Sequence, residues 1–248
     1  MTPSALFEVA CAGLLAGAMN AVLGGGSFVT LPVLMHVGVA PVLANATSSF
    51  ALTPGAAASA FAYRRELPMD RARLAALGVA SVVGGGLGAV LLLVTPEAVF
   101  LALVPALLLG ATLLLTFAPR LRGHDASRDR PVLGAALQLL ISIYGGYYGG
   151  GMGILMLAAM TLTTALGPHA QNALRSLLGA LINGVALTVF ALGGRIAWTA
   201  VGALTLGAVV GGYFAARHAR RLPARWLRRI VLVVAWGITA AFWLRLLH

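Results

Sequence analysis

Charged residues are scarce in this chain. They make up only 9% of its 248 residues, against 60% that are hydrophobic, whereas a soluble domain usually carries about 25% charged residues. This shortage excludes a soluble globular domain, and the several separate apolar runs exclude a protein with a single membrane anchor. The composition therefore predicts an all-α polytopic membrane protein in contact with a lipid bilayer.

Cysteine and acidic residues are also rare. The single cysteine, Cys11, excludes an intrachain disulfide and a cysteine-rich metal site. Nearly all of the six acidic residues lie in loops, which gives carboxylate catalysis or sodium coupling little support. The sequence also lacks a Ser-His-Asp order, histidine-rich metal spacing and a Walker loop. It thus predicts a protein that is not an enzyme, with no cofactor and no bound metal.

Lysine is absent, and all 17 basic residues are arginines in a chain of net charge +11. The arginines gather in short loops between apolar segments, which argues against a nucleic-acid partner. Loops 64–73 and 118–131 hold four each and loop 217–229 holds six, whereas 94–97 holds none and 193–195 holds one. Because basic loops stay in the cytoplasm, the three rich loops are predicted to lie inside and both termini outside. The N-terminus lacks the basic start of a signal peptide, so we expect the first apolar stretch to be retained.

Two glycine triplets, Gly24-Gly25-Gly26 and Gly149-Gly150-Gly151, interrupt the apolar pattern. Each follows a long apolar segment, 5–23 or 132–148, and precedes a short one. Breaks inside a membrane are tolerated only where protein or a water-filled cavity surrounds them. Paired breaks in the two halves of a chain are the best sequence indication of a transport site.

The two halves of the chain repeat one another. From 45 to 117 they align without gaps at an offset of 127, and the triplets align at an offset of 125. The matches include Asn45-Ala46 with Asn172-Ala173, Val82-Val83-Gly84-Gly85 with Val209-Val210-Gly211-Gly212, Pro96 with Pro223, and Gly110 with Gly237. The arginine-rich loops exchange places between the halves, which indicates inverted repeats.

This pattern predicts the domain organisation. A first membrane repeat covers 1–117, a cytoplasmic linker 118–131, and a second membrane repeat 132–248, with about four spans in each repeat and a broken or re-entrant helix at its start. Besides the segments at the triplets, the predicted spans are 43–63, 74–94, 97–117, 171–192, 196–216 and 226–246.

The string from Asn20 to Pro32, N-x-x-x-GGGS-x-x-x-x-P, resembles the TauE/SafE sulfite exporter family. The stretch from Ile143 to Gly153 and the Asn-Ala pairs at 45 and 172 resemble it as well, and the likeness covers nearly the whole chain. The resemblance implies a multi-pass permease of the bacterial cytoplasmic (inner) membrane. Members of the family export sulfite or organosulfonates, and some import thiosulfate or related anions.

The first set of candidate binding residues surrounds the two breaks. A helix N-terminus offers unpaired N–H groups and a partial positive charge to an anion, and glycine lets that backbone approach closely. The set comprises Gly24, Gly25, Gly26 and Ser27 with Gly149, Gly150, Gly151 and Met152. Ser27 is predicted to cap its helix or donate a hydrogen bond, whereas Met152 has no hydroxyl. The alternative is that the glycines serve only close packing or kinks.

The second set lies on the spans that follow. Asn45, Ser48 and Ser49 are spaced three and four residues apart on one helical face, and Asn172, Arg175 and Ser176 repeat that spacing. An arginine inside a membrane is a functional hypothesis because its burial is costly, and its planar fork suits an oxyanion. The alternatives are helix capping and interhelical hydrogen bonds for the neutral residues, and an Arg175 that extends to the lipid headgroups.

Together these features predict a permease for a small sulfur-containing anion of the sulfite, sulfonate or thiosulfate class. We expect an exporter that works by alternating access around a midplane site formed by two half-helix N-termini, since the inside-negative potential favours anion exit. An importer of thiosulfate or a similar anion is the alternative, and an intramembrane enzyme or assembly factor a third hypothesis. The sequence leaves open whether the protein is a homodimer.

Overall fold

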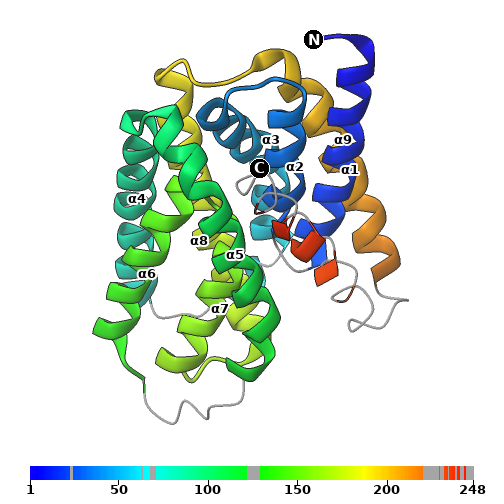
Figure 1. Ribbon diagram of the computed structural model, residues 1–248. Helices are drawn as coiled ribbons and strands as arrows, with labels where there is room; N and C mark the ends of the chain where they lie inside the picture. The colour runs from blue at the N-terminus through cyan, green and yellow to red at the C-terminus, as the bar shows by residue number, and fades with distance from the viewer. Residues whose placement is uncertain are drawn as a thin grey trace.

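The computed structural model describes residues 1–22, 25–62, 64–67, 71–121 and 129–219, with 229, 232, 233, 235–237, 239, 240 and 243. Throughout these residues the regular structure is helical (Figure 1). The first half contains α1 (Pro3–Val22), α2 (Ser27–His36), α3 (Pro41–Ala62), the short 3-10 helix η1 (Arg64–Glu66), α4 (Arg71–Val94) and α5 (Glu97–Leu121). The second half contains α6 (Pro131–Tyr147), α7 (Met152–Thr163), α8 (Pro168–Leu192) and α9 (Trp198–Ala219).

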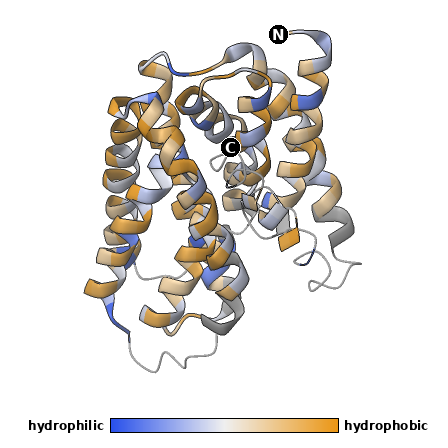
Figure 2. Ribbon diagram, viewed as in Figure 1, coloured by the Kyte–Doolittle hydropathy of each residue, from blue (hydrophilic) through white to orange (hydrophobic). Residues whose placement is uncertain are grey.

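Four of these helices are long and apolar enough to cross a membrane, judged by length and composition. The qualifying windows are Pro3–Asn20, Arg71–Val94, Ala170–Leu192 and Trp198–Ala215. Large apolar side chains cover their outer faces as well as the interior: Leu192 is 85% exposed and Leu206 70%. Figure 2 shows this apolar character along the length of the helices. Helices that are apolar all round suit a lipid environment, so the chain forms a multi-pass membrane protein.

Gly25 and Gly26 lie at the tip of one helical hairpin, and Gly149, Gly150 and Gly151 lie at the tip of another. Helix α2 packs back along α1, and at its end His36 Nε2 lies 4.0 Å from Glu8 Oε2 near the start of α1. Helix α7 likewise returns along α6, so that the Arg130 N–H, just before α6, donates to the carbonyl of Thr163, the last residue of α7, at 3.0 Å. The 10 and 12 residues of α2 and α7 span only about 15 and 18 Å. Neither helix is long enough to cross a hydrocarbon core alone.

The bundle has two ends that differ in charge. The first, called the Glu97 end, is defined by Glu8, His36, Glu97 and Arg195; the second, called the Arg73 end, by Arg73, Asp129, Arg130 and Thr163. Helix α4 runs from the second to the first, because Arg73 lies in its first turn and Glu97 follows its last residue closely. The starts of α4 and α6 both lie at the Arg73 end. The arginine-rich loops 64–73 and 118–131 therefore border the same end, as their composition predicts.

Helices of the first half pack against helices of the second. Helix α1 pairs with α9, and α4 pairs with α6. A side chain on Gly17 of α1 would overlap the Ala208 carbonyl of α9, and one on Gly88 of α4 would overlap the Ile143 carbonyl of α6. Small residues at such points let membrane helices approach closely. The bundle is thus held together between its halves.

Helices α3 and α8 pack against each other. Helix α3 also packs against α9, and α8 also packs against α4. Helices α3 and α8 follow the two hairpins in the chain, so their polar faces lie beside the breaks. The predicted span 226–246 falls mostly outside the described residues. Its described part contacts α5, where the Thr112 and Thr239 hydroxyls lie 3.0 Å apart.

Candidate functional site

The first break is closed by a side chain of the helix that precedes it. Asn20 Oδ1 accepts a hydrogen bond from the Gly26 N–H at 2.9 Å, and Gly25 adopts a φ of +101°, a conformation that favours glycine. Ser27 is the first residue of α2 and is buried, but the capping position belongs to Gly26 and shows no side-chain capping bond. The prediction that Ser27 caps this helix is therefore wrong. Gly24 lies outside the described residues.

The second break is closed by a tyrosine. The Tyr144 hydroxyl donates to the Gly150 carbonyl at 2.5 Å, while Gly149 and Gly151 have φ values of +78° and +75°. Gly151 occupies the capping position of α7 without a side-chain capping bond. Met152, which follows it, directs its sulfur against Gly145 of α6 and belongs to an apolar cluster of α4, α6, α7 and α8. Met152 is thus a packing residue in this structure.

The first turns of both short helices satisfy part of their own backbone. The N–H groups of Phe28 and Val29 donate to Gly25 and Gly26, and those of Met152 and Ile154 donate to Gly149 and Gly151. These bonds span three residues, which tightens the turn at each break. They leave fewer backbone donors for a ligand than an open helix end would, so side chains must supply more of any binding site.

Helix α3 connects the two hairpins. The hydroxyls of Ser48 and Thr30 form a hydrogen bond between α3 and α2, and both side chains are fully buried. One turn earlier, Asn45 Nδ2 donates at 2.8 Å to the carbonyl of Tyr147, at the end of α6. The polar face of α3 therefore contacts one hairpin through Ser48 and the other through Asn45.

Two further residues fix the position of this face. Ser49 Oγ lies 3.9 Å from the point that a Cβ on Gly149 would occupy, beside the second break. Thr47 lies on another side of α3, where its hydroxyl accepts the Ala197 N–H at 2.9 Å and donates to Leu43 at 2.6 Å. Thr47 thus anchors α3 to the segment between α8 and α9.

Helix α8 places a guanidinium at the second hairpin. Arg175 Nη1 lies 2.8 Å from the point that a Cβ on Gly153 would occupy, in the first turn of α7. Ser176 is buried and Asn172 is half-buried. Arg175 is itself half-buried, with its guanidinium directed at the hairpin. The structure therefore brings Arg175, Asn45 and Ser49 to the second hairpin, whereas Ser48 contacts the first.

Sequence reasoning missed the residues that hold the breaks closed. Asn20, Tyr144 and Thr30 were not among the candidate binding residues. The position of Asn20 in the N-x-x-x-GGGS string was the available signal, because a polar side chain before a break can bond to the freed backbone.

The described residues contain no group of three or more metal-ligating side chains.

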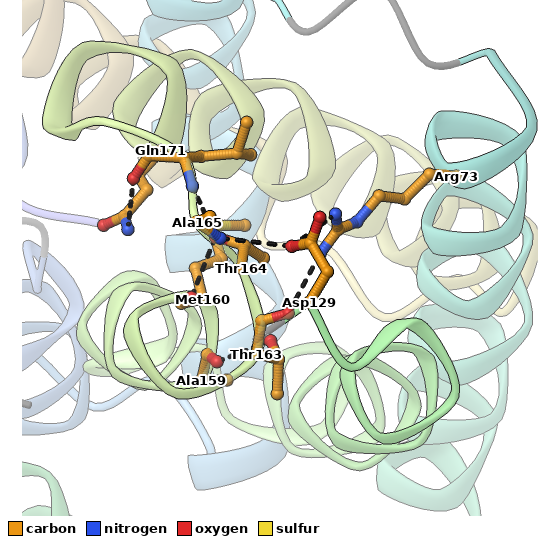
Figure 3. A network of polar contacts seen from close by, with 9 residues as sticks. Arg73, Asp129, Ala159, Met160, Thr163, Thr164, Ala165 and Gln171 are labelled. Carbon is orange, nitrogen blue, oxygen red and sulfur yellow. Dashed lines mark hydrogen bonds and ion pairs between the residues drawn. The ribbon is translucent and has the colours of Figure 1, made fainter. Parts of the chain in front are cut away.

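The Arg73 end carries a network of polar contacts (Figure 3). Arg73 donates to Asp129 Oδ1 and to the carbonyl of Thr163, both at 3.0 Å, and the Ala165 N–H donates to the same carboxylate oxygen at 3.1 Å. The hydrogen bond from Arg73, followed by that from Ala165, lowers the pKa of Asp129. A cation at the C-terminus of α7 also complements the helix dipole. The network joins α4, α6 and the turn after α7.

The Glu97 end carries a smaller counterpart. Glu97 Oε2 accepts the Val42 N–H, at the start of α3, at 2.8 Å, and Arg195 Nη1 lies 3.8 Å from Glu97 Oε1. At each end, a carboxylate thus accepts a backbone N–H and lies beside an arginine, but Asp129 holds the turn after α7, whereas Glu97 holds the first turn of α3. The two assemblies use residues at unrelated positions of the sequence.

Comparison with known proteins assigns the chain to a family. The sequence profile described as Sulfite exporter TauE/SafE matches residues 9–242. The chain belongs to the TauE/SafE family. It is 26% identical over 233 residues to a "Probable membrane transporter protein" of Haemophilus influenzae, a match that covers 93% of this chain and 91% of the relative. This confirms the resemblance expected from the triplet motifs.

Other relatives of this TauE/SafE chain are described in similar terms. "Probable membrane transporter protein YfcA" of Escherichia coli K12 is 25% identical, with 93% of this chain and 85% of the relative covered. "Probable membrane transporter protein ORF9" of Sinorhizobium is 25% identical, with 90% and 87% covered. No solved structure matches the chain significantly. The family and the helical bundle together identify a membrane transporter.

Proposed function

We propose that this TauE/SafE transporter is a permease that exports small sulfur-containing anions across the cytoplasmic membrane of a bacterium. The observation that carries the proposal is the contact of one polar helix face, on α3, with two glycine-broken hairpins that start from opposite ends of the bundle. Broken helices that meet near the membrane centre are the usual setting of a transporter binding site. The family profile supports the substrate class.

The depth of the polar residues supports a central site. Helix α3 starts at the Glu97 end, where Val42 bonds to Glu97, and α8 starts at the Arg73 end, where Ala165 bonds to Asp129. Ser48 lies seven residues beyond Pro41, and Arg175 lies seven residues beyond Pro168. Each is therefore about 10 Å into the bundle from its own end. A site between these two residues would lie close to the bilayer centre, and both hairpins would be re-entrant segments that reach it.

The helix contacts support inverted repeats. Thr112 and Thr239 occupy equivalent positions at the repeat offset of 127 and bond to each other, as expected for residues on a two-fold axis. The pairing of α1 with α9 mirrors that of α6 with α4, and the hairpins start from opposite ends. Two such halves can rock about a fixed site to give alternating access. With the arginine-rich end in the cytoplasm, the membrane potential favours anion exit.

Flux through proteoliposomes tests the proposal. We expect saturable transport of sulfite, thiosulfate or a simple sulfonate by the wild-type protein, accelerated by a potential that is negative inside the donor compartment. Arg175→Gln should reduce this flux at least tenfold because it removes the cation beside α7. Arg195→Gln is the matched control, since this arginine lies exposed at the Glu97 end, and its flux should stay near wild type. An absence of flux for all three anions contradicts the proposed function.

A further inference from the structure

The amide of Asn45 has a hydrogen-bonded nitrogen and an oxygen without a hydrogen-bond partner among the described residues. Its Nδ2 group donates to Tyr147 at 2.8 Å, which fixes the orientation of the amide, because a carbonyl oxygen can only accept. Its Oδ1 atom is buried and has no hydrogen-bond partner among the described residues, and the side chain as a whole is 1% exposed. A buried acceptor left without a donor is destabilising, so a ligand that donates a hydrogen bond to this oxygen would stabilise the site.

A second unsatisfied oxygen belongs to the same break. The Tyr148 hydroxyl, on the residue that follows Tyr147, is fully buried and has no partner within the described part of the chain. Unsatisfied buried oxygens are rare in folded proteins. Here one belongs to Tyr148, which directly follows α6, and the other to Asn45 of α3, whose amide bonds to the last residue of α6. Their coincidence at one break points to a ligand.

A cation lies beside the start of α7, the helix that follows this break. The Arg175 guanidinium lies against Gly153, in the first turn of α7, while Asn45 reaches the backbone just before the turn. A guanidinium attracts an oxyanion, whereas the amide oxygen of Asn45 would repel a fully deprotonated oxygen and attract an O–H or N–H group. A site with both elements matches an anion that also carries a hydrogen-bond donor.

We infer that Asn45 is a specificity-determining residue whose Oδ1 atom selects anions carrying a hydrogen-bond donor, such as a monoprotonated oxyanion or a hydroxy- or aminosulfonate. This inference rests on the proposed function, since it concerns which anion the central site prefers. Arg175 provides the charge attraction common to all anions, and Asn45 discriminates among them. The equivalent residue of the other half, Asn172, is half-buried and lacks this arrangement.

The test compares two ligands of the same size and charge. Hydroxymethanesulfonate and ethanesulfonate differ in having a hydroxyl or a methyl group at one end, and their binding to the purified protein can be measured by isothermal titration calorimetry. We expect the wild-type protein to prefer hydroxymethanesulfonate by roughly tenfold or more, because the methyl group leaves Oδ1 unpaired. Asn45→Leu should bring the ratio close to one. The control Asn183→Leu, at a half-buried asparagine of α8 outside the candidate binding residues, should preserve it.

The outcomes separate this inference from the proposed function. Equal binding of the two sulfonates by the wild-type protein overturns the role of Asn45, as expected if a bound water occupied Oδ1, but leaves anion transport intact. A preference that survives in Asn45→Leu also overturns it. Failure of the wild-type protein to bind either sulfonate or sulfite contradicts the proposed function and this inference together. Because equal binding by the wild-type protein by itself overturns the role of Asn45, the inference stays testable even if Asn45→Leu fails to fold.

Discussion

The two hairpins reach similar backbone shapes by opposite means. At the first break, a side-chain acceptor, Asn20 Oδ1, satisfies a backbone N–H. At the second, a side-chain donor, the Tyr144 hydroxyl, satisfies a backbone carbonyl. The second break also contains two glycines at positive φ, Gly149 and Gly151, against Gly25 among the described residues of the first. A glycine triplet thus determines where the chain turns, and the partner of the freed backbone can differ.

The hairpins also differ where they return to their own starting ends. The first ends in an exposed pair, His36 and Glu8, separated by 4.0 Å. The second ends in a network in which Arg73 bonds to both Asp129 and Thr163. We therefore expect the α6–α7 hairpin to be held more firmly at its open end than the α1–α2 hairpin. The following predictions test this difference, from the largest expected effect to the smallest.

Added volume at the first break should have the largest effect. A Cβ on Gly26 would stand 2.7 Å from the backbone oxygen of Ala16 in α1, so Gly26→Ala must push α2 away from α1. We expect a loss of about 3 kcal/mol, at the upper end for overpacking, in the free energy of unfolding measured by SDS titration. Gly151→Ala, which meets backbone strain at φ +75°, should cost about 1–2 kcal/mol.

Gly110→Ala is the control for this comparison. Nothing lies within 4 Å of a Cβ at Gly110, and an alanine there should leave stability unchanged or raise it by about 0.5 kcal/mol. A cost at Gly26 no greater than that at Gly110 would mean that α2 and α1 adjust freely. The first hairpin would then not depend on the close approach described above.

Removal of the closing side chains should have the next largest effect. Asn20→Leu leaves the Gly26 N–H without an acceptor, and Tyr144→Phe leaves the Gly150 carbonyl with one donor fewer. We expect costs of about 2 and about 1 kcal/mol respectively, since a buried unpaired N–H is tolerated less well than an under-satisfied carbonyl. The measurement is the same SDS titration. A larger cost for Tyr144→Phe than for Asn20→Leu would mean that the tyrosine hydroxyl stabilises its break more than the asparagine amide stabilises the first.

The sequence predicted the architecture well because the relevant signals are local. The triplets marked both hairpin tips, and the apolar runs marked the helices: the predicted span 74–94 corresponds to α4 (Arg71–Val94), and 171–192 to α8 (Pro168–Leu192). Glycine acts through its own φ and ψ, and an apolar run acts through its own length. Neither depends on distant partners.

The details of the candidate site depended on contacts between distant residues. Ser48 bonds to Thr30 and Asn45 bonds to Tyr147, pairs that no local spacing reveals. Met152 aligns with Ser27 in the repeat, yet its long apolar side chain packs beside Gly145 in an apolar cluster. The helical spacing placed Asn45 and Ser48 on one face, but it did not indicate which hairpin each residue contacts.

The pH dependence of the second hairpin should be smaller than these effects and confined to acid. Its bonds to Arg73 and Ala165 hold the pKa of Asp129 below the usual 3.8. A carboxylate with a lowered pKa stabilises the fold fully above that usual value, and the contribution is lost as pH falls through the lowered one. We expect the melting temperature of the wild-type protein to fall toward that of Asp129→Asn over this acid range. A constant difference between the two proteins at all pH values contradicts the assignment.

The exposed pair at the first hairpin should have the smallest effect. Glu8 and His36 are 49% and 67% exposed at the side chain and 4.0 Å apart, and solvent-exposed ion pairs contribute about 0–1 kcal/mol. Glu8→Gln should therefore leave the melting temperature at neutral pH unchanged within error. Asp129→Asn should lower it, because Asp129 closes the second hairpin through bonds to both Arg73 and the Ala165 N–H. If Glu8→Gln lowers the melting temperature as much as Asp129→Asn does, the open ends of the two hairpins are equally anchored. The difference between the hairpins would then lie only in how their breaks are closed.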